Sequence, residues 1–558
     1  MKEIKRLFIL PMLIGVLGGF SAILVREIIH YSSTIVDTVE FYPHYEYLYL
    51  IFIPFIFLVS SIIIHKFLTD TSNPTIDSVA KSIVLKKGRL DYKKGLASVI
   101  LTSINIGFGV PVGREGPIAK FGGSFTALFL KLFKTKGVNT PLFVTCGVTS
   151  ALAATFNAPI AAIVFGFEII LGRLNFNIII PLSISSITAT IISRYFLGNY
   201  PTFYVHKFTY DHLFLLLIPL FAIAFSFMII FYESVYETLL KVSAKFHISH
   251  YKKALIGGIA VSLLLYLYPD AASLGYSHVN ELFNSKYSFH TAFELSIIKA
   301  IALAITFASG MFGGIFAPSI FIGAFFGFGL GSLTGFFTGI DPLAIALIGT
   351  AAMTAGMSNA PFRSSLIIIE LTQNYQMAVP ILLTSVLTVY IVHAFEEKIH
   401  FARAIMQKGF DLGNEEYRKK LENLEITHLI DDNIIVLSPK MLIKDIIYDL
   451  MDGTSSYFPV VENKKLVGVL SFRDIRLIRD RDDYGKITVE ELMTKNPHAL
   501  SINANGMDVF EFISHIDAGH IPIINNQEDH IYVGMLDVHA FKKFVSFLYL
   551  EKEDTTLH

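Results

Sequence analysis

An arginine and a glutamate lie between two glycines in the segment Gly113-Arg114-Glu115-Gly116-Pro117, which sits in a long and mostly apolar part of the chain. An ionisable residue at membrane depth is costly, so it marks a functional site by default. Proline suits the first turn of a helix, and the free N–H groups of that turn attract an anion. Glu115 is therefore predicted to occupy an anion site, or to swing away and admit a mobile anion. The alternative is an ordinary polar helix cap.

A second motif occurs twice, 202 residues apart, as Asn157-Ala158-Pro159 and Asn359-Ala360-Pro361. Each copy opens an apolar segment, and Glu168 and Glu370 each follow nine residues after the proline. Chance recurrence of three residues is plausible, but recurrence with an acid at the same spacing is much less so. Two related halves with interrupted helices are typical of transporters with inverted repeats, whose site lies near the bilayer midplane.

A third interrupted segment runs from Gly310 to Pro318 and again ends in a proline that can start a helix. Its glycines let the backbone approach a ligand closely. The backbone N–H groups of Ile315 and Phe316 are predicted to be anion donors. The alternative explanation is close helix packing through small residues.

The composition indicates a membrane protein. Of the 558 residues, 53% are hydrophobic and only 16% are charged, which is too apolar for a soluble chain of this size. Residues 138–167 and 301–340 carry no charge, whereas charges become frequent after Glu396, so a membrane region precedes a smaller soluble one. No basic cluster suggests nucleic acid. The single cysteine, Cys146, supports neither a disulfide nor a zinc site.

Several apolar segments are shorter than the roughly 20 residues that cross a bilayer. Irregular backbone inside a membrane is tolerated only where it is buried in protein or lines a cavity, so a channel or transporter is favoured over a membrane enzyme. No phosphate-binding loop, metalloprotease motif or Cys/His cluster is present. Lys2, Lys5 and Arg6 favour a cytoplasmic N-terminus before a retained first span. The helical segments are expected near 46–68, 94–109, 117–133, 141–155, 159–172, 176–196, 211–233, 253–268, 290–309, 318–337, 343–357, 361–372 and 378–395.

These motifs resemble, in order and spacing over roughly residues 5–410, the signatures of the CLC family of chloride channels and proton-coupled chloride transporters. The resemblance implies an α-helical polytopic membrane protein with an inverted repeat. It further implies a homodimer in a lipid bilayer, of the bacterial inner or plasma membrane type, with one pathway for chloride or other small anions in each subunit. No cofactor is expected to be required.

The resemblance also implies roles for individual residues. Glu115 falls on the family's external gating glutamate. The backbone that lines the anion sites corresponds to Arg114, Gly116, Ile315 and Phe316.

Three departures bear on the mechanism. Proton-coupled members are similar to one another in a second, inward glutamate, and alignment on Asn157 puts Ile169 there. Glu168 is one residue earlier, about 100° round the helix, and is expected to face elsewhere. The two side-chain donors of the family's central site, a serine and a tyrosine, correspond to Pro74 and Phe401, which lack hydroxyl groups. A slipped register would instead supply a hydroxyl from Thr71, Ser72 or Thr75.

The soluble part contains a repeat that resembles tandem CBS domains, with a short strand, a turn, a second strand and a helix in each copy. In the family such pairs can bind adenine nucleotides through a Ser/Thr and an Asp, which Ser471 and Asp474 match in the first copy. In the second copy Asp537 and Ala540 fall at those places, and Asp537 would repel phosphate. A structural or dimerising role remains equally open.

The sequence therefore predicts a membrane anion-transport domain (1–410), a linker (411–424), and two CBS domains (425–484 and 485–558) on the cytoplasmic side. The predicted function is a CLC-type anion channel gated by Glu115, passive rather than strongly proton-coupled. The alternative is a proton/chloride antiporter that uses Glu168 or a water path. A membrane enzyme or a receptor lacks support.

Overall fold

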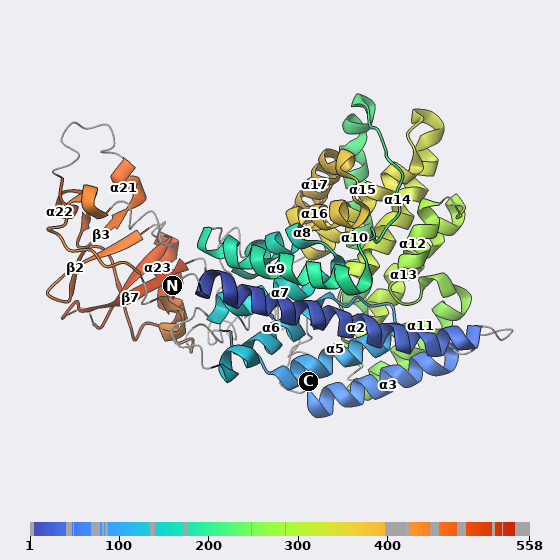
Figure 1. Ribbon diagram of the computed structural model, residues 1–558, viewed down its shortest axis with the longest axis horizontal. Helices are drawn as coiled ribbons and strands as arrows, with labels where there is room; N and C mark the ends of the chain where they lie inside the picture. The colour runs from blue at the N-terminus through green and yellow to red at the C-terminus, as the bar shows by residue number, and fades with distance from the viewer. Residues whose placement is uncertain are drawn as a thin grey trace. The chain divides into compact units, whose positions relative to one another are not determined.

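The computed structural model divides into two compact units, Met1–Glu396 and Glu397–Thr556, apart from the last two residues. Figure 1 shows the membrane unit as a helical body and the other unit as two small sheets with short helices. The structure describes residues 5–40, 47, 49–68, 79–80, 83, 88–133, 140–171, 176–246, 248–284, 286–396, 421, 423–431, 434–446, 457–476, 487–515, 519–526, 528–538 and 540–541.

The first unit is built of helices, as the apolar segments predict. Among its described residues, seven helices are long and apolar enough to cross a membrane, and shorter apolar helices lie between them. The helices are α2 (Leu10–Glu40), α3 (Tyr49–Phe67), α5 (Tyr92–Gly107), α6 (Glu115–Leu132), α7 (Thr140–Phe156), α8 (Pro159–Phe165), α9 (Phe176–Leu197), α10 (His212–Lys245), α11 (His250–Leu267), α12 (Tyr276–Phe283), α13 (Phe289–Ala308), α14 (Phe316–Thr338), α15 (Pro342–Ser358), α16 (Pro361–Thr372) and α17 (Ala378–Glu396).

The internal repeat predicted from the sequence is present in the packing. In the first half α6 packs on α7, and α2 packs on α5, α7 and α9; in the second half α14 packs on α15, and α10 packs on α13, α15 and α17. Across the halves, α8 packs on α16 and α3 packs on α11. The short helices α8 and α16 lie together in Figure 1.

The Asn-Ala-Pro motif makes the same sharp junction in both halves. Asn157 and Asn359 have φ angles of 54° and 50°, in the left-handed region that asparagine tolerates at a helix end. The alanine that follows has a non-helical backbone, with φ of −131° in the first copy and −143° in the second, and the proline opens the next helix, where its missing N–H costs nothing. Local backbone chemistry therefore ends one helix and starts another within three residues.

The second unit contains two sheets, in the region where the sequence predicts two copies of one motif. One sheet has the order β2-β3-β4 and is antiparallel, and the other has the order β1-β7-β6-β5, in which β5 and β6 are parallel. Its elements are β1 (Ile430–Asp431), β2 (Tyr457–Glu462), β3 (Lys465–Ser471), α21 (Phe472–Arg476), α22 (Val489–Leu492), β4 (Thr494–Lys495), β5 (Leu500–Ser501), α23 (Gly506–His515), β6 (His520–Ile524) and β7 (Tyr532–Asp537).

The two copies exchange a strand. Residues Ile430 and Asp431 fall by sequence in the first copy, yet β1 pairs antiparallel with β7 of the second sheet. Lys465 and Ile531 form a further bridge between the copies. The chain boundary between the copies is therefore not the boundary between the two sheets.

Candidate functional site

Two glycine loops, one from each half, pair backbone to backbone in front of α6 and α14. Gly113 donates its N–H to the carbonyl of Gly314 at 2.6 Å, and Gly314 donates to the carbonyl of Gly113 at 2.6 Å. Equivalent positions that pair antiparallel are related by a local twofold axis, as expected for an inverted repeat. Each loop leaves the preceding helix through a glycine with positive φ, Gly109 at 91° and Gly310 at 80°. The pairing brings the N-termini of the two helices together.

The side chain of Glu115 lies between these loops. It is the first residue of α6 and is 2% exposed. Its Oε1 accepts a hydrogen bond of 3.2 Å from the backbone N–H of Ala317, in the first turn of α14. Among the residues that the structure describes, none donates a hydrogen bond to Oε2. A Cβ on Gly113 or Gly314 would overlap this oxygen, so both glycines are needed for the carboxylate to fit.

The carboxylate thus occupies the N-terminus of the helix in the opposite half. Free N–H groups and the helix dipole favour negative charge at such a position. The donor, Ala317, is not one of the residues proposed from the sequence. Ile315 is the N-cap of α14 and Phe316 is its first residue, and both lie beside the carboxylate's donor in the chain. Which N–H group of a first turn faces a ligand depends on the angle at which the helices meet, and sequence spacing does not give that angle.

Arg114 and Gly116 flank Glu115 at the start of α6. Arg114 is the N-cap residue, and its guanidinium donates to the carbonyl of Thr155 at 3.4 Å. The same guanidinium lies 5.9 Å from the ring centre of Phe156. Gly116 is buried in the first turn. The arginine side chain is therefore directed to the end of α7, and any part it takes in anion binding rests on its backbone.

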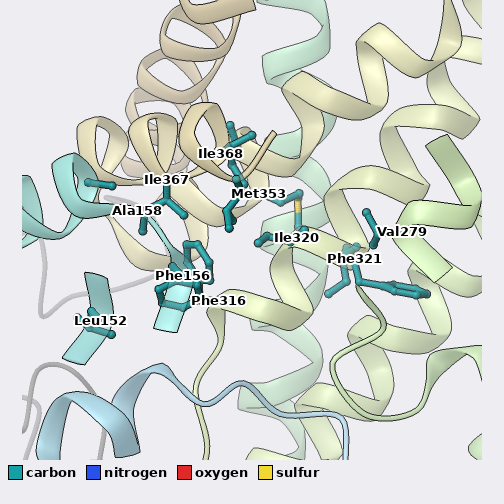
Figure 2. Close-up of a cluster of buried hydrophobic side chains, with 14 of the residues drawn as sticks. Leu152, Phe156, Ala158, Val279, Phe316, Ile320, Phe321, Met353, Ile367 and Ile368 are labelled. Atoms are coloured by element: carbon teal, nitrogen blue, oxygen red, sulfur yellow. The ribbon is translucent and has the colours of Figure 1, made fainter. Parts of the chain in front are cut away.

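A small cavity of about 20 Å³, room for about one water molecule, adjoins Glu115. Its wall is apolar except for two charged residues, Glu115 and Arg363. Figure 2 shows part of the wall within a hydrophobic cluster. The cavity is lined by Glu115, Leu152, Phe156, Ala158, Ala162, Phe165, Phe316, Arg363 and Ile367.

Arg363 was missed in the sequence analysis. It is 2% exposed, in the first turn of α16, and donates to the Ser358 hydroxyl at 2.7 Å. A signal was present: it is a charged residue two positions after the second Asn-Ala-Pro proline, in an otherwise apolar segment.

The two acids with matching spacing cap each other's helices. Glu168 accepts from the N–H of Arg363 at 2.9 Å, at the start of α16. Glu370 accepts from the N–H groups of Ile160 and Ala161 at 3.2 and 2.8 Å, at the start of α8. Each half therefore satisfies the free N–H groups of the other. This reciprocal capping gives the repeated acids a structural role.

Of the remaining predicted positions, the structure describes the backbone of Ile169 but not Pro74 or Phe401. Ile169 lies in the π-helical turn η3 (Gly166–Leu171), which continues α8. Pro74 and Phe401 lie outside the residues that the structure describes, so the loss of both hydroxyl donors stays a prediction.

In the second unit the predicted nucleotide residues bond to each other. The backbone N–H and the hydroxyl of Ser471 donate to Oδ2 of Asp474 at 2.9 and 2.7 Å. In the other copy, Asp537 accepts from the N–H of Ala540 at 3.2 Å. Both pairs stabilise the turn that follows the second strand, and nucleotide binding stays a prediction.

Apolar spanning helices, a repeated half and a buried carboxylate on a helix N-terminus together define a membrane transport protein for anions. The family model for voltage gated chloride channels matches residues 56–393, and the CBS domain model matches residues 426–479. The chain belongs to the CLC family and carries C-terminal CBS domains. It is a multi-pass membrane protein in a family of channels and transporters.

Individual relatives agree with this assignment. An uncharacterized protein of Methanocaldococcus jannaschii is 30% identical over 376 residues, which cover 66% of this chain and 88% of that protein. The H(+)/Cl(-) exchange transporter ClcA of Vibrio cholerae is 26% identical over 408 residues, covering 67% and 84%.

Solved structures show the same fold. A slow cyanobacterial Cl-/H+ antiporter superposes with a TM-score of 0.63 at 21% identity, covering 73% of this chain and 99% of that one. A eukaryotic CLC transporter superposes with a TM-score of 0.63 at 19% identity, covering 96% and 98%.

Proposed function

We propose that this protein moves chloride and other small anions across a membrane, and that the carboxylate of Glu115 is its gate. The observation that carries this proposal is the position of that carboxylate, on the N–H of Ala317 and against Gly113 and Gly314. A helix N-terminus favours any small anion. The side chain therefore holds a place that a mobile anion takes when the side chain leaves.

The assembly proposed for this function is a homodimer with one pathway in each subunit. The CLC fold supports this proposal, and the pathway of one subunit is bounded by loops from both halves of the same chain. A variant that prevents dimer formation is then expected to change the stability of the protein more than it changes anion transport through each pathway.

Transport is proposed to be passive, with at most weak coupling to protons. Ile169 offers no titratable group at the inward position. Glu168, its acidic neighbour, accepts a hydrogen bond from the start of α16. The cavity next to Glu115 is also lined by the guanidinium-bearing Arg363, and a buried cation repels a proton that approaches through that cavity.

The second candidate is a proton-coupled antiporter. It is favoured by the relative from Vibrio cholerae, which is named an H(+)/Cl(-) exchange transporter and matches 67% of this chain. In that case Glu115 exchanges protons by a water path that avoids Ile169.

The deciding experiment records anion efflux and proton flux together from liposomes that contain the purified full-length protein. Anion efflux without proton movement supports passive transport. A fixed ratio of anions to protons supports the antiporter. Absence of anion flux from protein that is correctly folded by gel filtration contradicts both.

A further inference from the structure

Tyr276 has a buried hydroxyl group that the packing around it does not explain. Its ring meets the ring of Phe203 edge-on, with the ring centres 5.0 Å apart and the planes at 73°. Among the residues that the structure describes, none forms a hydrogen bond with its phenolic oxygen. A buried polar group without a partner lowers stability, and each such group in a folded protein needs a reason. A phenylalanine would fill the same space without this cost.

The fold places this hydroxyl near the gate. Tyr276 is the first residue of α12 and follows Gly275, whose φ is 74°. A Cβ on Gly275 would overlap the ring of Phe321 in α14, so α12 begins in close contact with that helix. The N-terminus of α14 is where the carboxylate of Glu115 lies. That carboxylate is close enough for its charge to act on the phenol of Tyr276.

Two neighbouring charged groups also carry an unpaired atom. Oε1 of Glu115 accepts from the N–H of Ala317, whereas none of the described residues donates to its Oε2. In the same part of the chain, Nε of Arg114 is buried without an acceptor. The charge of Arg114 acts on both Glu115 and Tyr276. A hydroxyl, a carboxylate oxygen and a guanidinium nitrogen therefore lie within electrostatic range of one another, each without a hydrogen bond.

The displaced gate needs a hydrogen-bond donor. An anion that takes the place of the carboxylate at the N-terminus of α14 removes the bond from Ala317, and a buried carboxylate without a donor is costly. Tyr276 does not line the cavity that adjoins Glu115, so its hydroxyl lies outside the space in which that anion would arrive. A phenolic O–H can donate to a carboxylate, and such charge-assisted bonds are short and strong.

We infer that the hydroxyl of Tyr276 donates a hydrogen bond to the carboxylate of Glu115 when this side chain leaves the N-terminus of α14. Tyr276 is then a positioning residue that stabilises the open gate, while its ring stays packed on Phe203. The inference rests on the proposed function, because it requires Glu115 to be the gate. It explains why a tyrosine hydroxyl is buried next to a carboxylate that it does not contact while the gate is closed.

The test measures chloride efflux from liposomes that contain the purified full-length protein, with Tyr276→Phe made in the wild-type and Glu115→Ala backgrounds. The substitution removes the hydroxyl and keeps the ring. In the wild-type background efflux is expected to fall by about tenfold, as for loss of a hydrogen bond to a charged group. In the Glu115→Ala background there is no carboxylate to receive, so the fall is expected to be less than about twofold in this double-mutant cycle.

Tyr287 provides the matched control. It follows α12 in the chain, and its hydroxyl donates to the carboxylate of Asp270 at 2.9 Å. Tyr287→Phe therefore makes the same chemical change beside the same helix, at a hydroxyl that already has a partner. It is expected to lower the melting temperature and to leave efflux almost unchanged in both backgrounds.

Three results would overturn the inference. Unchanged efflux of Tyr276→Phe in the wild-type background shows that the hydroxyl does not stabilise the open gate. An equal fall in both backgrounds shows that it acts on the anion or on packing rather than on the carboxylate. A rise in efflux shows that it holds the gate closed. If Tyr276→Phe does not fold, Tyr276→His, which keeps a ring donor, is compared with Tyr276→Leu, and equal efflux by these two variants refutes the inference.

The gate and this inference fail in different ways. If Glu115→Gln leaves efflux unchanged, Glu115 is not the gate and the inference about Tyr276 falls with it. If Glu115→Gln raises efflux while Tyr276→Phe leaves it unchanged, the gate stands and Tyr276 is not part of it.

Discussion

Replacing Glu115 by glutamine tests the gate most directly. The amide keeps the size of the side chain and can still accept a hydrogen bond from Ala317, but it carries no charge. Hydrogen bonds to a charged group are worth about 1.5–3 kcal/mol, roughly twice as much as neutral ones. The helix dipole adds about 0.3–1 kcal/mol, and up to about 2 kcal/mol where the charge is partly buried. The difference between charged and neutral hydrogen bonds and the dipole term together make the carboxylate compete with a mobile anion by about 1–3.5 kcal/mol more than the amide does.

This difference converts into a large effect on transport. Because each 1.36 kcal/mol is a factor of ten, Glu115→Gln is expected to raise chloride efflux, or to lower the chloride concentration for half-maximal efflux, by about fivefold to a few hundredfold. The assay is chloride efflux from liposomes at matched protein content, read with a chloride electrode over a range of pH.

The matched control is Glu370→Gln. Glu370 also caps a helix, accepting from Ile160 and Ala161 at the start of α8, but it does not line the cavity. It is expected to lower thermal stability and to leave efflux almost unchanged. Unchanged efflux and an unchanged pH response in Glu115→Gln would refute the gate, and so would equal effects of the two substitutions.

Further predictions address packing and regulation. Gly314→Ala places a Cβ on the carboxylate of Glu115, so it should raise efflux and lower the melting temperature. The fall in melting temperature should be smaller in a Glu115→Ala background, and an equal fall in both backgrounds would contradict the overlap. Lys299 is fully buried and donates to the carbonyls of residues 271–273. Lys299→Met should leave these carbonyls without a donor, at a cost in stability of about 1–3 kcal/mol each. It should lower the melting temperature in detergent without changing anion preference. Adenine nucleotide at a hundredfold excess over its dissociation constant should stabilise the full-length protein by about 2.7 kcal/mol. Asp474→Ala should abolish the resulting rise in melting temperature. If millimolar ATP or AMP causes no rise in the protein with Asp474, the CBS pair has only a structural role.

Much of the membrane fold follows from local chemistry that the sequence records. The junctions at Asn157 and Asn359 depend on a residue that tolerates positive φ and on a proline that opens the next helix. Both are properties of neighbouring residues, so the repeated motif predicts the repeated structure. The prediction for Glu115 is also local, because a carboxylate next to a glycine at a helix start resembles a bound anion whatever the helix packs against.

The pairing of the two halves depends on tertiary structure instead. The bond between Glu115 and Ala317, the capping of α16 by Glu168, and the contact of Arg363 with Phe165 all join residues far apart in the chain. Sequence periodicity shows which residues are apolar or lie at helix ends. It does not show how helices from two halves cross, and that crossing decides which N–H group faces a carboxylate.

The same distinction separates the candidate roles of the acids. By sequence, Glu168 and Glu370 are two carboxylates at equivalent positions, suited to proton transfer or to capping. The packing of α8 on α16 places each of them at the start of the other's helix. The sequence by itself determined the class of protein and predicted the gate, because both rest on local motifs. The tertiary structure alone decided the partners of each charge, because a charge buried in a membrane is defined by what packs against it.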